Sequence, residues 1–100
     1  MPTKLDPITP GEILLKEFLE PMGISQHKLA RDIHVPTTLI NDIVYDKRGI
    51  TADTALRLSA YFGTTPEFWI NLQTRYNLKI AKRDLWPEIE KKIRPLQDAA

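Results

Sequence analysis

The short polar side chains of Thr37, Thr38 and Asn41 fall on one edge of a single predicted helix. An asparagine amide can bind N6 and N7 of adenine together, and a threonine methyl group can contact the methyl group of thymine. The other edge of this segment is apolar and recurs at helical spacing: Leu39, Ile40, Ile43 and Val44. The pattern predicts a helix that buries one edge and presents hydrogen-bonding groups on the other, either to base edges or to solvent.

Residues on either side of this segment can bind phosphate. Gln26 opens the preceding predicted helix, where exposed N–H groups and the positive end of the helix dipole favour an anion. Lys28, Lys47 and Arg48 carry charges that can contact the backbone of DNA. Asp42 lies on the same polar edge, and since phosphates repel a carboxylate, we expect it to be solvated or paired with a lysine or arginine.

A helix-turn-helix is the element that would position these side chains, and we place it over Ser25–Tyr45. Ser25 can cap the first of the two helices. Ala30 is small enough to let the second helix cross closely, and Val35 supplies an apolar residue at the end of the turn. The agreement of several independent features makes this assignment more specific than any one of them.

The rest of the sequence also predicts an all-α chain. It contains residues typical of helix starts and ends, and no alternating strand pattern exceeds three or four residues. We expect an N-terminal arm over 1–9 and a first helix that starts at Thr9-Pro10 and stops near Pro21, since the residue before proline resists helical geometry. The later helices follow in order: Ser25 to about Ile33, Pro36 to before Asp46–Gly49, Thr51 to Gly63, a fifth from Thr65-Pro66, and a last segment with Ile89, Ile93 and Leu96 at helical spacing.

Composition bounds the class of protein without identifying a ligand. One hundred residues suffice for one domain, and no apolar run is long enough to span a membrane. The N-terminus lacks an apolar signal segment, so we expect a cytoplasmic protein. Fourteen Lys+Arg against thirteen Asp+Glu leave a net charge of +1, which alone would not suggest a nucleic-acid partner.

We expect no enzyme and no cofactor. Ser25, His27 and Asp32 belong to one short helix and cannot converge as a catalytic triad. His27 and His34 lack further ligands at metal spacing, and the chain contains no cysteine, so we expect no metal site. Neither a Gly-rich phosphate loop nor a pair of carboxylates stands out.

Aromatic and apolar residues of the C-terminal half are candidates for packing against a second copy or another partner. Trp69 and Tyr76 fall on one helical stripe, which fits either the core or a dimer contact. Trp86, Ile89 and Ile93 would leave an apolar strip on a small domain, and such strips favour partner surfaces. A dimer contact is the favoured interpretation, because two DNA half-sites need a two-fold protein.

Longer blocks of the sequence resemble a known family. The segment ISQHKLARDIHVPTTLINDIVYDKRGIT is similar to the Cro/C1-type helix-turn-helix. The blocks TPGEILLKEFLEPMGIS, KRGITADTALRLSAYFGTTPEFWINLQTRYNL and IRPL resemble the HigA/VapI antitoxins within that family, so that the likeness spans roughly residues 7 to 96. It implies a five-helix, lambda-repressor-like helix-turn-helix domain over 10–77 with a C-terminal helical extension over 78–100.

The resemblance also implies a function. Members of this family are dimeric antitoxins that bind operator DNA, repress their own operon and neutralise a RelE-like, mRNA-cleaving toxin. By position, Gln26, Thr37, Thr38 and Asn41 would face DNA, and Lys47 and Arg48 would contact its backbone. The chain departs from the family pattern at Pro36, at Asp42 and at Tyr45-Asp46, which leaves the operator sequence and affinity open. The alternatives are a stand-alone transcription regulator and an interaction module that has lost DNA binding.

Overall fold

The computed structural model describes residues 7–96, and every regular element in that range is helical, which confirms the all-α class. The first helix comprises α1 (Pro10–Ile13), a π-helical segment η1 (Leu14–Leu19) and α2 (Glu20–Met22). It is followed by α3 (Gln26–Asp32), α4 (Thr37–Val44), α5 (Ala52–Phe62), α6 (Pro66–Asp84) and α7 (Trp86–Lys92). None of these helices is both long and apolar enough to cross a membrane.

The first helix ends at Met22, one residue after Pro21, so its predicted end near Pro21 is confirmed, but the predicted cause is wrong. Glu20 keeps right-handed helical backbone angles although it precedes the proline, and its N–H donates to the carbonyl of Leu15, five residues back. This wider turn carries the helix on to Gly23, which ends it with a left-handed φ of 65°. The steric preference before proline is therefore overridden by a local change of hydrogen-bond register.

Side-chain caps explain where most of the helices begin. Ser25 accepts a hydrogen bond from the N–H of Lys28, as Thr9 does from Glu12 at the start of the first helix. Thr51 and Thr65 cap α5 and α6 in the same way. Pro36 lies one residue before α4 in extended geometry rather than inside the helix.

One core joins the first helix, α3, α4, α5 and the start of α6. Its largest fully buried side chains come from all of these elements: Trp69, Leu14, Leu19, Leu29, Ile40, Ile43, Leu58 and Thr54. Phe18 packs against both Phe62 and Trp69, with ring centroids 4.9 Å apart in each pair. Trp69 is fully buried and donates its indole N–H to Thr64, so Trp69 belongs to the core, and the alternative of a dimer or partner contact is wrong for this residue.

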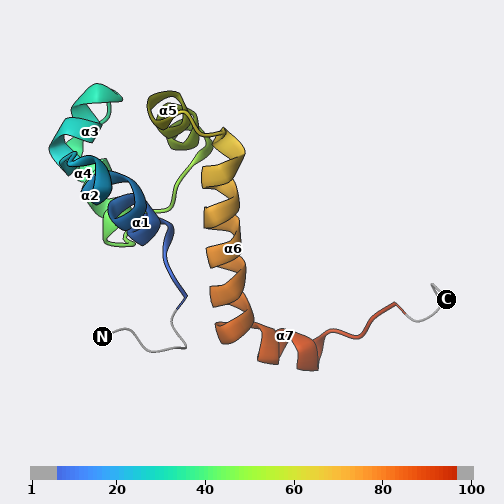
Figure 1. Ribbon diagram of the computed structural model, residues 1–100. Coiled ribbons are helices and arrows are strands. Elements are labelled where there is room, and N and C mark those ends of the chain that lie inside the picture. Colours follow the sequence, from blue (N-terminus) through green and yellow to red (C-terminus); the bar gives the residue numbers. More distant parts are fainter. Residues whose placement is uncertain (1–6, 97–100) are drawn as a thin grey trace.

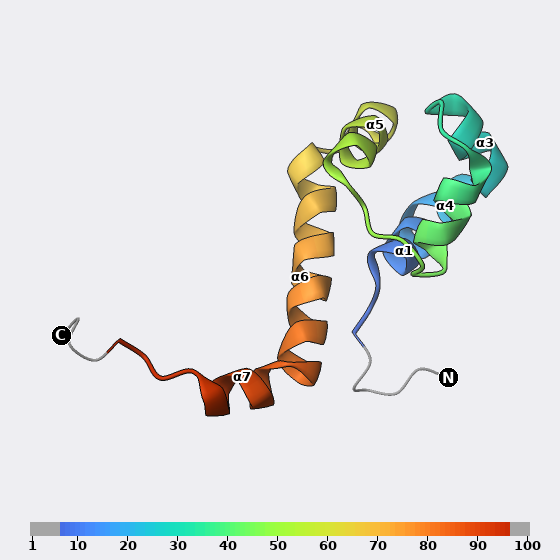
Figure 2. The same ribbon diagram turned by 180° about the vertical axis from the view of Figure 1, so that it is seen from behind.

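The C-terminal part of the chain leaves this core. Figures 1 and 2 show α6 as a long helix beside the other helices and α7 turning away from them at its far end. The radius of gyration is 17.0 Å, against about 13 Å for a compact chain of this length. We call residues 78–96 the C-terminal arm; α6 runs into it without a break at residue 77.

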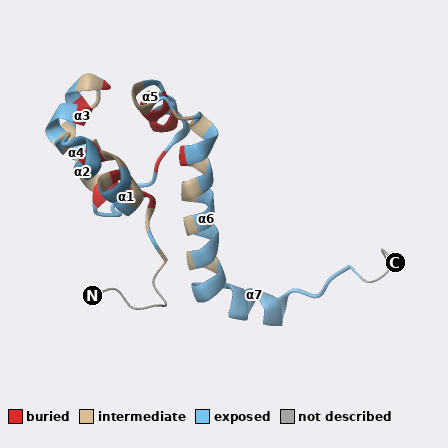
Figure 3. Cartoon of the chain, in the orientation of Figure 1, coloured by how far each residue is buried: buried red, intermediate tan, exposed pale blue. Residues whose placement is uncertain are grey.

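The arm is largely exposed (Figure 3), and α7 has no buried residue. The predicted last helical segment is shorter than its apolar spacing suggested, because α7 ends at Lys92 and Ile93 has extended backbone angles. Leu96 lies beyond the helix.

Candidate nucleic-acid interface

Helix α4 has the two edges that its sequence predicted. Ile40 and Ile43 are buried in the core, whereas Thr38 is exposed and Asn41 is half-buried on the outer edge. Thr37 is the first residue of the helix and is also half-buried. Side chains that can form hydrogen bonds thus line the outside of the N-terminal half of α4, while its apolar residues fix the helix to the body.

Gly11 sets how closely the first helix approaches α4. A Cβ atom at this position would overlap the backbone carbonyl of Ile43 and crowd Val44. The absence of a side chain therefore lets the two backbones touch, and α4 is held at its C-terminal end by main-chain contact as well as by side-chain packing.

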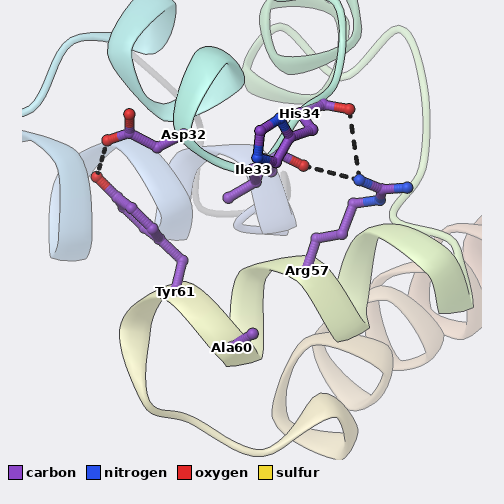
Figure 4. Close-up of a pocket in the computed structure, with 6 residues that line it drawn as sticks. All are labelled: Asp32, Ile33, His34, Arg57, Ala60 and Tyr61. Carbon is purple, nitrogen blue, oxygen red and sulfur yellow. Dashed lines mark hydrogen bonds between the residues drawn. The ribbon is translucent and has the colours of Figure 1, made fainter.

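A residue of α5, Arg57, stabilises the turn between α3 and α4 through hydrogen bonds. His34 has a left-handed φ of 62° at this turn. Arg57 donates from Nη1 to the carbonyl of Ile33 at 2.8 Å and more weakly to that of His34 at 3.4 Å, as Figure 4 shows. These bonds satisfy carbonyl groups that the end of α3 leaves without helical partners. Arg57 is in turn oriented by Asp53, whose carboxylate lies 3.0 Å from its Nε.

Asp32, at the end of α3, forms hydrogen bonds with one residue of its own helix and one residue of α5. Its carboxylate accepts from the ammonium of Lys28 at 2.8 Å and from the hydroxyl of Tyr61 at 2.6 Å. The hydrogen bond from Lys28, followed by that from Tyr61, holds the pKa of Asp32 below its ordinary value, and the same contacts raise the pKa values of both donors. Lys28, a predicted phosphate ligand, is therefore engaged within the chain.

The loop after α4 carries the predicted basic pair and is fixed by α6. Asp46 has a left-handed φ of 60° and accepts from the hydroxyl of Tyr76 at 2.5 Å. The N–H of Ile50 donates to the side-chain oxygen of Gln73 at 2.7 Å. Tyr76, which the sequence offered as a partner contact, is half-buried and uses its hydroxyl inside the chain.

Both members of that basic pair, Lys47 and Arg48, are exposed on this loop. The guanidinium of Arg48 lies 3.7 Å from the carboxylate of Asp42, which matches the expected pairing of that carboxylate with a cation. The ion pair reduces the negative charge on the outer edge of α4. A guanidinium has five N–H donors, so Arg48 can hold Asp42 and still bind a phosphate.

Helices α3 and α4 are in contact near their N-terminal ends. Gln26 is half-buried as the first residue of its helix. The next residue, His27, lies with its Nδ1 atom 3.2 Å from the hydroxyl oxygen of Thr37. A side chain of α3 thus touches a predicted DNA-facing residue of α4.

The structure places Thr38 and Asn41 on the outer edge of α4 and Arg48 beside Asp42 of the same helix. The sequence did not reveal the residues that hold these elements in place. Arg57, Tyr61 and Gln73 lie more than twenty residues from the groups that they bind. The sequence assigned no binding role to His27, although its ring contacts Thr37. Within residues 7–96, no group of three potential metal ligands converges.

Comparison with known proteins identifies the family. Residues 15–69 match the helix-turn-helix family. Virulence-associated protein I of Dichelobacter nodosus is 57% identical over 77 residues, which cover 77% of this chain and 71% of that protein. Antitoxin HigA-1 of Vibrio cholerae is 38% identical over 94 residues, 94% of this chain and 88% of the relative. The chain belongs to the HigA-type antitoxins of the Cro/C1-type helix-turn-helix family.

A solved relative extends the likeness to three dimensions. The Pseudomonas aeruginosa antitoxin HigA, solved with the higBA promoter, superimposes with a TM-score of 0.87 at 49% identity. The match covers 90% of this chain and 98% of that one. The HigA-type fold therefore includes the C-terminal arm as well as the helix-turn-helix body.

Proposed function

We propose that this chain is a DNA-binding antitoxin that represses its own operon as a homodimer and neutralises a RelE-like, mRNA-cleaving toxin. The observation that carries the DNA-binding part is the outer edge of α4, where Thr37, Thr38 and Asn41 face away from a buried apolar edge. The relative solved with its promoter supports the same reading. A protein with this role works in the cytoplasm, where operator DNA and translated mRNA are found.

Each side chain has a distinct task in this proposal. Asn41 binds adenine through its amide, and the two threonines contact neighbouring base edges in the major groove. Gln26, Lys47 and Arg48 bind phosphates and set the register of α4 on the duplex. Because the net charge is only +1, we expect a modest dependence of affinity on salt.

The C-terminal arm supplies the proposed dimer contact. Trp86 and Ile89 on α7 and Ile93 just after it remain exposed, although α7 is too short to be stable without packing. A cavity of about 300 Å³ lies at the bend between α6 and α7, lined in part by Ile80 and Leu85. A second copy covers this apolar surface in the proposed dimer, whose two α4 helices must enter half-sites about 34 Å apart.

The toxin is the proposed second partner, and the family relationship supports it. The antitoxin itself contributes binding and no catalysis in this account. We expect the toxin to be encoded beside this chain as a short basic ribonuclease, and we leave its docking surface unassigned.

Fluorescence anisotropy with a duplex from the chain's own promoter region tests DNA binding. A scrambled duplex of the same composition serves as control, and both are titrated at two salt concentrations. The proposal expects nanomolar, specific binding with one dimer on each palindrome. Equal affinity for both duplexes would favour an interaction module that has lost DNA binding.

Coexpression with the neighbouring gene tests the antitoxin role. We expect the toxin alone to arrest growth, and coexpression of this chain to restore growth and to yield a complex on purification. Specific DNA binding without any toxin in the neighbourhood would instead favour a stand-alone transcription regulator.

A further inference from the structure

A hydrogen bond between side chains connects the two helices of the helix-turn-helix at their N-terminal ends. His27 Nδ1 lies 3.2 Å from Thr37 Oγ1. The imidazole is exposed and Thr37 is half-buried, so the pair lies at the edge of the surface that faces DNA in the proposed function. Within residues 7–96, the ring of His27 has no other hydrogen bond.

The direction of this hydrogen bond decides what Thr37 can recognise. A neutral imidazole has one nitrogen that donates and one that accepts, and the bond made by either nitrogen fixes the role of the other. If Nδ1 accepts, the single hydroxyl proton of Thr37 is used towards His27, and the oxygen of Thr37 can only accept from a base. If Nδ1 donates, the hydroxyl proton of Thr37 remains available to a base acceptor.

We propose that His27 is a specificity-determining residue that turns the hydroxyl of Thr37 into a hydrogen-bond acceptor facing DNA. This inference rests on the proposed function. The outward Nε2–H of His27 donates to a phosphate oxygen, as the neighbouring Gln26 does through its amide. Nδ1 then accepts from the Thr37 hydroxyl, and the Thr37 oxygen accepts from an amino group of a base.

The chemistry of the recognised base follows from this relay. In the major groove, amino groups are presented by adenine at N6 and by cytosine at N4, whereas guanine and thymine present oxygen and nitrogen acceptors. The base opposite Thr37 is therefore an adenine or a cytosine. In this proposal the side chain of His27 on α3 contacts a DNA phosphate and also orients the residue of α4 that binds a base.

Base analogues that lack the amino group test the inference directly. Each adenine of the promoter duplex is replaced in turn by purine, and each cytosine by 2-pyrimidinone. Wild-type protein should lose roughly 3- to 10-fold in affinity at the base read by Thr37, the effect of one hydrogen bond. Thr37→Val, which lacks the hydroxyl, should show no loss at that base and keep its loss at the adenine read by Asn41.

Two substitutions of His27 separate its roles. In His27→Asn, the side-chain oxygen takes the place of Nδ1, so the analogue effect should persist while all duplexes bind about 2- to 10-fold more weakly through the lost phosphate contact. In His27→Gln, the amide takes the place of Nε2 and keeps the phosphate contact. The unmodified promoter should bind roughly 3- to 10-fold more weakly through the lost base contact, and the analogue effect should disappear. His34→Asn, which changes the chain's other histidine and suits its left-handed backbone, should behave as wild type.

Three results would overturn the inference. The first is an analogue effect that survives in His27→Gln. The second is additive losses on the unmodified duplex in the double variant of Thr37→Val and His27→Gln, because residues joined in a relay must show coupling. The third is a wild-type protein that binds its promoter specifically but shows no loss of affinity, dependent on Thr37, for any duplex that lacks an amino group. A wild type that does not prefer its promoter would instead refute the proposed function itself.

Discussion

The helix-turn-helix body and the C-terminal arm use their apolar residues in opposite ways. In the body, Trp69 is fully buried and its indole N–H is bonded to Thr64. In the arm, Trp86 is 50% exposed and α7 has no buried residue (Figure 3). One tryptophan completes the core of a single chain, and the other has no core to join.

The apolar residues of the body contribute to folding, whereas those of the arm are available for contact with another molecule in the proposed dimer. The helices of the body share one core, and that core fixes the outer edge of α4, which binds DNA in the proposed function. The arm leaves its apolar residues exposed, and in the proposed dimer a second copy covers them, since burial of such surface is the main stabilising term in folding and association. Substitutions in the two regions should accordingly change different measurements.

The largest effect on folding is expected from Gly11→Ala. The added Cβ would overlap the Ile43 carbonyl, so the first helix and α4 must separate, and we expect a loss of about 2–4 kcal/mol in the free energy of unfolding. Urea titration followed by circular dichroism measures it. Glu17→Ala, an exposed change on the same first helix, serves as control and should alter stability little. A Gly11→Ala protein as stable as the control would contradict the close approach.

Trp86→Ala should weaken dimerisation and leave the body folded. Removal of a buried aromatic at an interface costs about 2 kcal/mol or more, which corresponds to a rise of roughly 30-fold in the dimer dissociation constant. Sedimentation velocity over a range of concentrations measures this constant. Leu56→Ala removes an apolar side chain of α5 that is 59% exposed and should have no such effect. Equal behaviour of the two variants would remove the arm from the dimer contact.

Arg48→Ala should weaken binding to specific and scrambled duplexes alike. The phosphate contact is independent of sequence, so we expect the slope of log affinity against log salt to fall by about one for each protomer. Anisotropy at four salt concentrations gives the slope. Lys91→Ala, a change of charge on the arm, is the matched control. An unchanged slope would mean that the loop after α4 lies away from the DNA backbone.

The smallest effect concerns acid stability. The pKa of Asp32 is held below its ordinary value of 3.8 by Lys28 and then by Tyr61, so its contribution to stability is present above that value and is lost as the pH falls through its folded pKa. Asp32→Asn should therefore flatten the decline in stability below pH 3.8. Parallel thermal melts of both proteins at several acidic pH values would reveal an identical decline if the carboxylate is unimportant.

Local signals in the sequence were sufficient to place most helix starts. Thr9, Ser25, Thr51 and Thr65 each accept the expected hydrogen bond from an N–H three residues later. Such caps act over one turn, so they can be recognised without knowledge of the fold. The apolar edge of α4 was predictable for the same reason, because its periodicity is contained within one helix.

Contacts between distant residues were not predictable in this way. The bonds from Arg57 to Ile33 and from Tyr61 to Asp32 depend on how α5 packs against α3. The two tryptophans have similar apolar surroundings in the sequence, yet only the packed structure distinguishes the buried Trp69 from the exposed Trp86. Pro21 shows a third limit, because a change of helical register let the chain pass a residue that normally ends a helix.

The most direct test of the central claim, that the outer edge of α4 reads DNA, is the binding of Asn41→Ala to the promoter and scrambled duplexes. Loss of the bidentate contact with adenine should cost about 1–3 kcal/mol on the promoter duplex and almost nothing on the scrambled one. The dimer dissociation constant and the unfolding midpoint should not change, because Asn41 is half-buried and outside the core. An equal loss on both duplexes, or no loss on either, would contradict the account.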